Sequence, residues 1–308
     1  MISRRNIRVK VMQSIYALRA DNNGTVDKGT LTSRLKKQFD LSFSLLGYQL
    51  WFLTEVARYA ETDASIRGNK HLPTQEDLTV ATKIAGNEVL WRILESDLYK
   101  DTVALYKFDG FEENKDMVKA AYKLLVESPV YITYNNTPGR DKRAEKEVLE
   151  YIYTDLMIAN DNWVSFVEEK YTNWDDDAEM LRQIVMQYLQ KPGVYTISNL
   201  ISPDKRQFAN ELINTVFEKN EELETIIKPK LRNWDADRLA LLDMILLQMG
   251  VSEFLYFETI PVKVTINEYI DLAKEYSTAQ SGQFVNGILD NVRKELETEN
   301  RIVKKSFK

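Results

Sequence analysis

Two neighbouring stretches near the C-terminal end decide the fold: IPVKVTINE at residues 260–268 and SGQFVNGILD at residues 281–290. In each stretch apolar residues recur every three or four positions, which is the spacing of one face of an α-helix. The pattern continues beyond the quoted letters and predicts helices over about residues 262–276 and 281–297. Pro261 and Ser281 stand where such helices would begin.

The same periodicity runs through most of the chain. Further helical patterns lie at about residues 4–20, 43–64, 74–96, 114–127, 141–158, 177–190, 205–218 and 236–249. Residues 130–134 and 194–197 have strand-like composition, and each can equally be an extended loop. Only 11 Gly and 7 Pro occur in 308 residues, and because these residues punctuate turns, their scarcity favours long helices. The sequence therefore predicts an all-α fold.

The composition excludes several kinds of chemistry. With no Cys and one His, the chain has no disulfide, no Cys/His zinc site and no thiol nucleophile. His71 lies in a polar turn before a Pro and is expected to be a solvated loop residue. Neither a GxG dinucleotide fingerprint nor a GxxxxGK[ST] phosphate loop occurs. We therefore expect no catalytic residue, no metal and no cofactor.

The sequence contains no segment typical of a membrane protein. Its longest uncharged run, residues 41–54, is shorter than the roughly 18 to 20 apolar residues that span a bilayer, and it is interpreted as a buried or interfacial helix. The first residues lack the apolar block of a secretory signal. The expectation is a cytoplasmic protein without membrane contact.

Charge is distributed unevenly along the chain. Residues 1–20 contain five basic and no acidic residues, whereas residues 21–204 have a net charge of −9 and residues 205–308 one of −2, giving −6 in total. A basic segment on an acidic protein can attract a polyanion to one end. The charges alone are equally compatible with a solvated helix face.

The two C-terminal stretches, in the pattern IPxKVxINExIxLAK followed by SxxFVNGxLD, closely resemble the NusB family of bacterial transcription antitermination factors. The opening Arg4-Arg5-Asn6-Ile7-Arg8, followed by QSIYAL at residues 13–18, matches the arginine-rich first helix of that family. The resemblance covers residues 1–20, as the first helix of the core, and 205–297, as its C-terminal part. Residues 298–308 are expected to form a polar tail.

Residues 21–204 depart from the family pattern and are interpreted as a large, acidic, mostly helical insertion. The motif NWDxD occurs at residues 173–177 and again at 233–237. An internal repeat of a helix, an Asp-capped turn and a second helix is one explanation, and chance recurrence of a good helix cap is the other.

The resemblance implies a helical bundle of two subdomains that binds the boxA element of nascent ribosomal RNA. It also implies a heterodimer with the ribosomal protein NusE, within the transcription elongation complex, and no catalysis. A related domain precedes a methyltransferase in some rRNA cytosine methyltransferases, but this sequence has no Gly-rich cofactor unit and no Cys. The alternative is a protein adaptor that has lost RNA binding and works through its insertion.

The RNA site that the resemblance implies combines basic residues with the start of the last helix. Arginine binds phosphate and stacks on bases, and free amides at a helix start attract anions. The expected RNA-binding residues are Arg4, Arg5, Arg8, Lys10, Lys263, Ser281, Gly282, Gln283 and Phe284. Ser281 is expected to be the N-cap, and Phe284 either stacks on a base or packs in the core. Asn267 and Glu268 are expected to form hydrogen bonds within the protein.

Two residues match positions that the resemblance places toward the protein partner. Tyr16 offers an aromatic anchor and Asp243 a negative charge for a basic ribosomal protein, although ordinary surface positions would look the same. The insertion is expected to project away from the RNA face. It should also bury a core of its own around Trp51, Trp91, Trp163 and Trp174.

Overall fold

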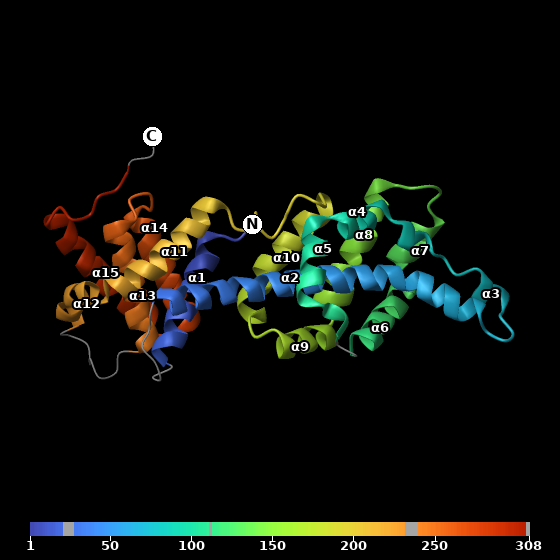
Figure 1. The fold of residues 1–308 in the computed structure, drawn as a ribbon, viewed down its shortest axis with the longest axis horizontal. Helices are drawn as coiled ribbons and strands as arrows, with labels where there is room; N and C mark the ends of the chain where they lie inside the picture. Colours follow the sequence, from blue (N-terminus) through green and yellow to red (C-terminus); the bar gives the residue numbers. More distant parts are fainter. Residues whose placement is uncertain (21–27, 111–112, 232–239, 306–308) are drawn as a thin grey trace. The chain divides into compact units, whose positions relative to one another are not determined.

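A computed structural model describes residues 1–20, 28–110, 113–231 and 240–305. Helices form nearly all of the regular structure, and no strand occurs in these four ranges, so the predicted all-α fold class is confirmed. The chain divides into two compact units (Figure 1). The first comprises Asp40–Ile201 together with Met1, and the second comprises Ile2–Phe39 and Ser202–Lys308.

The second unit joins the two ends of the chain around one apolar helix. Its helices are α1 (Arg4–Ala20), the first part of α2 (Lys28–Gly68), α11 (Pro203–Glu218), α12 (Asn220–Ile227), α13 (Leu241–Tyr256), α14 (Val262–Tyr276) and α15 (Ser281–Thr298). Every residue from Ile245 to Phe254 is buried, because α13 packs against α1, α11, α12, α14 and α15. A helix that is apolar on all sides is stable only in such a position.

The first unit is built from short helices around the second part of α2. They are α3 (Gln75–Leu78), α4 (Glu88–Glu95), α5 (Asp97–Tyr106), α6 (Glu113–Glu127), α7 (Pro129–Asn136), α8 (Lys142–Tyr151), a π-helical turn (Ile152–Ile158), α9 (Asp161–Lys170) and α10 (Trp174–Gln190). The core contains Trp51 and Trp163, which pack near Tyr48, and Trp174, which packs against Trp163. The expectation that Trp91 is also buried is wrong: it is 51% exposed on α4.

The segment 130–134 forms a helix and neither a strand nor an extended loop. Ser128 accepts a hydrogen bond from the Tyr131 amide and Pro129 occupies the first turn, which together start α7. Tyr131 and Tyr134, three residues apart, are both buried. The two tyrosines that suggested a strand therefore form the buried face of a helix, whereas Ile132 and Thr133 are exposed. Residues 194–197 form a loop, as one of the two alternatives expected.

Helix α2 extends the second unit beyond the predicted first helix. It begins at Lys28 and not near residue 43, and its residues Leu31, Leu35 and Phe39 are buried. The boundary between the units falls within this helix, after Phe39, whereas the predicted insertion begins at residue 21. The uncharged run 41–54 lies within α2 and is largely buried.

The described part of the C-terminal tail packs back on the second unit. The ammonium group of Lys304 donates hydrogen bonds to the carbonyl oxygens of Glu253 and Phe257, at 2.7 and 2.9 Å. These carbonyls belong to the last turn of α13 and the residue after it, so Lys304 satisfies free acceptors of a helix end.

The first NWDxD motif lies at the start of α10. Asn173 precedes the helix without a side-chain cap, and Asp177 is buried, where it accepts hydrogen bonds from Ser42 and Asn173 at 2.6 Å each. The second motif, residues 233–237, lies outside the described residues. In the four described ranges no helix is long and apolar enough to cross a bilayer.

Candidate nucleic-acid and partner interfaces

Arg8 belongs to a buried network of the second unit. It is 2% exposed and makes a bidentate ion pair with Glu253, at 2.7 Å from Nε to Oε1 and 3.0 Å from Nη2 to Oε2. Thr265 and Tyr269 donate their hydroxyl groups to the same carboxylate, at 2.9 and 2.8 Å. Arg8 also lies 3.2 Å from Glu268, which is thus engaged in an ion pair within the protein.

The electrostatics of this network favour a charged Arg8. Burial lowers the pKa of Arg8, but Glu253, together with Tyr269 and Glu268, more than offsets burial, so that the pKa is raised. Burial, followed by the same carboxylate, raises the pKa of Tyr269 well above its ordinary value. The prediction that the Arg8 side chain faces RNA is therefore wrong, because this side chain is buried. The cause is the buried Glu253, which lies on the central helix α13.

Lys10 was also expected on the RNA face, and its side chain is likewise buried. It is engaged in interactions inside the protein. A buried ammonium group is stable only with such partners. Lys10 therefore has a structural position in α1.

Arg4 and Arg5, at the start of α1, are partly exposed to solvent. Their side chains are 42% and 38% exposed. Arg4 lies 3.7 Å from Asp204 and over the ring of Phe208. Arg5 pairs with Glu275 at 2.8 Å and lies 3.8 Å from Glu268. Both guanidinium groups are thus held by protein carboxylates while part of each side chain remains accessible.

The start of α15 differs from expectation at Ser281. The N-cap is Gln280, and Ser281 is the first helical residue, with its hydroxyl group donating to Asp243 at 2.9 Å. Ser277 donates to the other oxygen of Asp243 at 2.7 Å. Ser281 and Asp243 are both buried, so neither side chain faces a partner as expected. They join the start of α15 to the start of α13.

Gly282 and Phe284 are buried as well. A Cβ atom placed on Gly282 would lie 2.7 Å from Cγ of Lys274, so this glycine makes room for the stem of that lysine rather than for a phosphate. Phe284 is 5% exposed and packs in the core, which is the second of the two alternatives expected. Gln283 and Lys263 are exposed, as expected.

Lys263 and Lys274 lie on a different side of α14 from Glu268 and Glu275, although Asp271 pairs with Lys274 at 3.9 Å on the basic side. At 3.6 residues per turn, Lys263 and Lys274 are about three turns apart and share a face, whereas Glu268 and Glu275 are about two turns apart and share another. Arg5 contacts both glutamates. The structure therefore brings Arg5 to the acidic face of α14.

An apolar pocket of about 580 Å³ lies beside Tyr16. Its lining residues come from α1, the start of α13 and the end of α14: Met12, Gln13, Tyr16, Ala240, Leu241, Leu242, Tyr276, Ser277 and Thr278. Tyr16 is 45% exposed at this pocket, as expected of a partner-binding anchor. Asp243 is buried next to this pocket, where it accepts a hydrogen bond from the lining residue Ser277.

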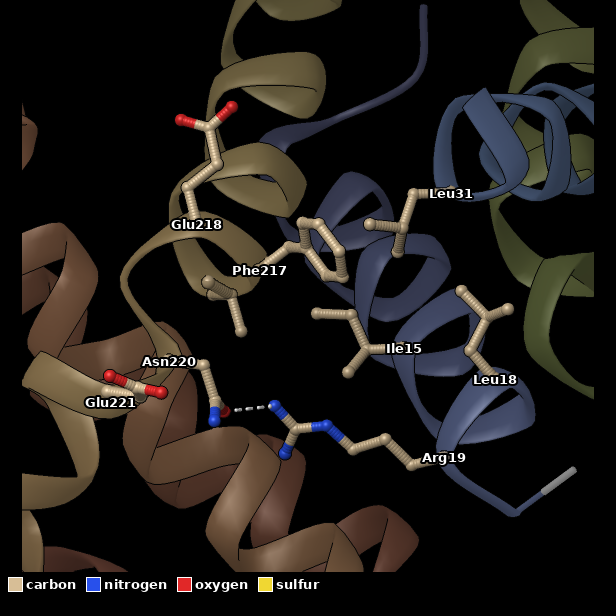
Figure 2. Close-up of a pocket in the computed structure, with 9 residues that line it drawn as sticks. Ile15, Leu18, Arg19, Leu31, Phe217, Glu218, Asn220 and Glu221 are labelled. Atoms are coloured by element: carbon tan, nitrogen blue, oxygen red, sulfur yellow. Dashed lines mark hydrogen bonds between the residues drawn. The ribbon is translucent and has the colours of Figure 1, made fainter. Parts of the chain in front are cut away.

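A second pocket of about 410 Å³ lies between α1, α2, α11 and α12 (Figure 2). Apolar side chains including Ile15, Leu31 and Phe217 line it, and Arg19 donates to Asn220 at 2.9 Å on one side. Glu218 and Glu221 stand at its rim. None of the predicted site residues line this pocket. The pocket forms where four helices that are distant in the sequence pack together, which motifs in the sequence do not indicate.

The described residues contain no group of three or more His, Asp or Glu side chains placed to hold a metal ion. The polar clusters of the second unit are instead ion pairs and hydrogen bonds between helices, as at Glu253 and Asp243.

Comparisons with known proteins find one family. A model of the NusB family matches residues 169–294, from the end of α9 into α15. Three curated proteins are each named transcription antitermination protein NusB. That of Methylacidiphilum infernorum is 37% identical over 126 residues, which is 38% of this chain and 87% of the relative.

The other two relatives are covered less completely. The protein of Salinibacter ruber is 40% identical over 102 residues, 33% of this chain and 64% of the relative. That of Fervidobacterium nodosum is 42% identical over 97 residues, 32% of this chain and 66% of the relative. The chain thus spans slightly less than two thirds of these two proteins. No solved structure matches the chain.

Proposed function

The chain belongs to the NusB family, and from that membership we propose that it is a non-catalytic transcription antitermination factor. In this proposal it binds boxA-type single-stranded RNA of nascent ribosomal RNA transcripts together with the ribosomal protein NusE. The complex acts in the transcription elongation complex, and therefore in the cytoplasm.

The observation that supports RNA binding is the exposed pair Arg4 and Arg5 at the start of α1. Cations at a helix N-terminus oppose the helix dipole, so helix stability alone does not favour them there. Their guanidinium groups suit phosphates and unstacked bases of a single strand. The proposed RNA face consists of Arg4, Arg5, Lys263 and Gln283, which are the exposed or partly exposed members of the expected set.

The pocket beside Tyr16 supports a protein partner. A half-exposed aromatic side chain next to an apolar hollow is typical of the anchor residues that dominate binding energy at interfaces. We assign this pocket to NusE, with Tyr16 as the anchor. The buried Asp243 acts there through Ser277, which lines the pocket.

The test of RNA binding compares two double variants by fluorescence anisotropy with labelled boxA RNA, with and without NusE. Replacing Arg4 and Arg5 by Ala should weaken binding and flatten the log–log salt slope by about 1.4, since each lost phosphate contact changes it by about 0.7. The matched control replaces Arg143 and Arg182, exposed arginines of the first unit, by Ala. An equal effect of both variants would show that the net charge of the protein, and not a site at Arg4 and Arg5, determines RNA binding. No RNA binding by the unaltered chain would favour the adaptor function.

A further inference from the structure

We propose that Glu275 is an intramolecular competitor of RNA, which occupies Arg5 in the free protein and is displaced from it when a phosphate binds. The inference rests on the proposed RNA-binding function. It adds to the proposed RNA face a residue that lowers the affinity for RNA. Glu275 stands in none of the motifs that identify the RNA site, and its partner Arg5 lies 270 residues away in the sequence.

The geometry singles out Glu275 among the carboxylates near the arginines. Its Oε2 lies 2.8 Å from Nη2 of Arg5, and the two side chains are 51% and 38% exposed. Glu268 lies farther from Arg5, at 3.8 Å, and is held by the buried Arg8 at 3.2 Å. Glu275 is therefore the carboxylate that can leave Arg5 without disturbing the core network.

Lys274 and Glu275 are neighbours in the sequence, but their side chains reach different helices. Lys274 runs its side chain against Gly282 at the start of α15, whereas the carboxylate of Glu275 reaches Arg5 on α1. A phosphate that binds Arg5 therefore competes with this carboxylate for the same guanidinium group.

The exchange is energetically accessible. Exposed ion pairs contribute little to stability, because water and salt screen them and two long side chains must be ordered. A guanidinium group binds phosphate as well as it binds carboxylate, in the same bidentate geometry. One contact thus replaces another, and the cost of breaking the pair lowers the affinity for RNA by roughly twofold to fivefold.

The experiment measures boxA RNA binding by the full chain and by four variants: Glu275→Gln, Arg5→Ala, the double variant, and Glu299→Gln. Glu275→Gln should tighten binding about twofold to fivefold and steepen the log–log salt slope by up to about 0.7, because Arg5 then gives its full charge to a phosphate. In the Arg5→Ala background the same change should have little effect. Thermal melting of each variant shows that the fold is retained.

Glu299→Gln is the matched control. It removes one negative charge from an exposed glutamate that pairs with Arg301, beyond the end of α15. The 18 residues of α15 place about 27 Å of helix between Glu299 and the helix start, which exceeds a Debye length of about 10 Å. This control should leave RNA affinity unchanged.

Each outcome decides the proposal. Unchanged or weaker binding by Glu275→Gln, or an equal gain in the Arg5→Ala background or from Glu299→Gln, would overturn the competitor role while leaving RNA binding in place. Absence of boxA binding by the unaltered chain and by Glu275→Gln alike would instead overturn the proposed function. Binding that appears only in Glu275→Gln would show complete inhibition by this residue.

Discussion

Arg8 and Glu253 lie 245 residues apart and meet in the interior of the second unit as a bidentate ion pair. Thr265 and Tyr269 satisfy further lone pairs of the carboxylate, and the rings of Phe208 and Tyr269 lie within 6 Å of the guanidinium carbon. The pair connects the first helix of the chain to the central helix α13. Burying two charges is costly, but leaving one of them alone is much more so.

Replacing Arg8 by Met should therefore destabilise the second unit by about 3 to 5 kcal/mol, because Glu253 would remain buried without its partner. Urea denaturation followed by far-ultraviolet circular dichroism measures this loss. Four of the five tryptophans belong to the first unit, so the transition detected by tryptophan fluorescence should move less.

Two further variants distinguish a structural Arg8 from an RNA-binding one. Arg5→Ala should change stability by less than about 1 kcal/mol, since its ion pairs are exposed. Combining Arg8→Met with Glu253→Leu should restore much of the loss, because no unpaired charge remains. A stable Arg8→Met variant with weakened RNA binding would show instead that Arg8 contacts RNA.

Phe284→Ala addresses the same question at the start of α15. The buried ring should make the substitution cost about 3 to 5 kcal/mol of stability, while RNA affinity of the folded variant stays within about twofold. Denaturation and anisotropy, both at a temperature where the variant is folded, measure the two effects. Base stacking would give the opposite result, a loss of about 1 to 3 kcal/mol in binding with unchanged melting.

The first helix shows what the sequence can and cannot predict. Periodicity gives its range, 4–20, as the structure has it, because Ile7, Val11 and Ile15 form a local pattern. The different positions of the Arg4, Arg5 and Arg8 side chains depend on residues at least 200 positions away. A signal did exist: Arg8 shares the helix face of Met12 and Ile15, and Glu253 is an acidic residue within an apolar helix.

The residues of the RNA site are predicted from their positions in sequence motifs. Such a position does not show whether a side chain contacts RNA or packs inside the protein. Ser281, Gly282 and Phe284 have side chains compatible with both, and only the placement of Asp243 and Lys274 shows that they pack. Helix α7 was missed for a related reason. Its aromatic and β-branched residues favour strands in general, yet the cap at Ser128 and burial on one face decide for a helix.

Tyr16→Ala tests the proposed partner pocket. Loss of a half-exposed aromatic anchor should weaken NusE binding tenfold or more, equivalent to about 1.4 kcal/mol, with little change in melting temperature. Isothermal titration calorimetry measures the affinity. The matched control is Tyr256→Ala, at the other end of α13 and 40% exposed. An equal loss from both substitutions would argue against the pocket.

The last prediction concerns the first unit. A variant lacking residues 40–201, with Phe39 joined to Ser202 by a flexible linker, should unfold cooperatively and bind boxA RNA with similar affinity. It keeps residues 28–39 of α2, whose Leu31 packs beside Ile15 and Val216 in the second unit. The removed unit contains Trp51, Trp163 and Trp174 with their own core.

The informative comparison is a longer deletion, of residues 21–204, which joins the predicted core segments directly. It removes the buried side chains of Leu31, Leu35 and Phe39, and each lost core side chain costs about 2 to 5 kcal/mol. We expect this variant to melt far lower or to remain unfolded in circular dichroism and denaturation. If the shorter deletion folds but fails to bind RNA, the first unit itself contributes to recognition, and the acidic charge of that unit does not keep it away from the strand.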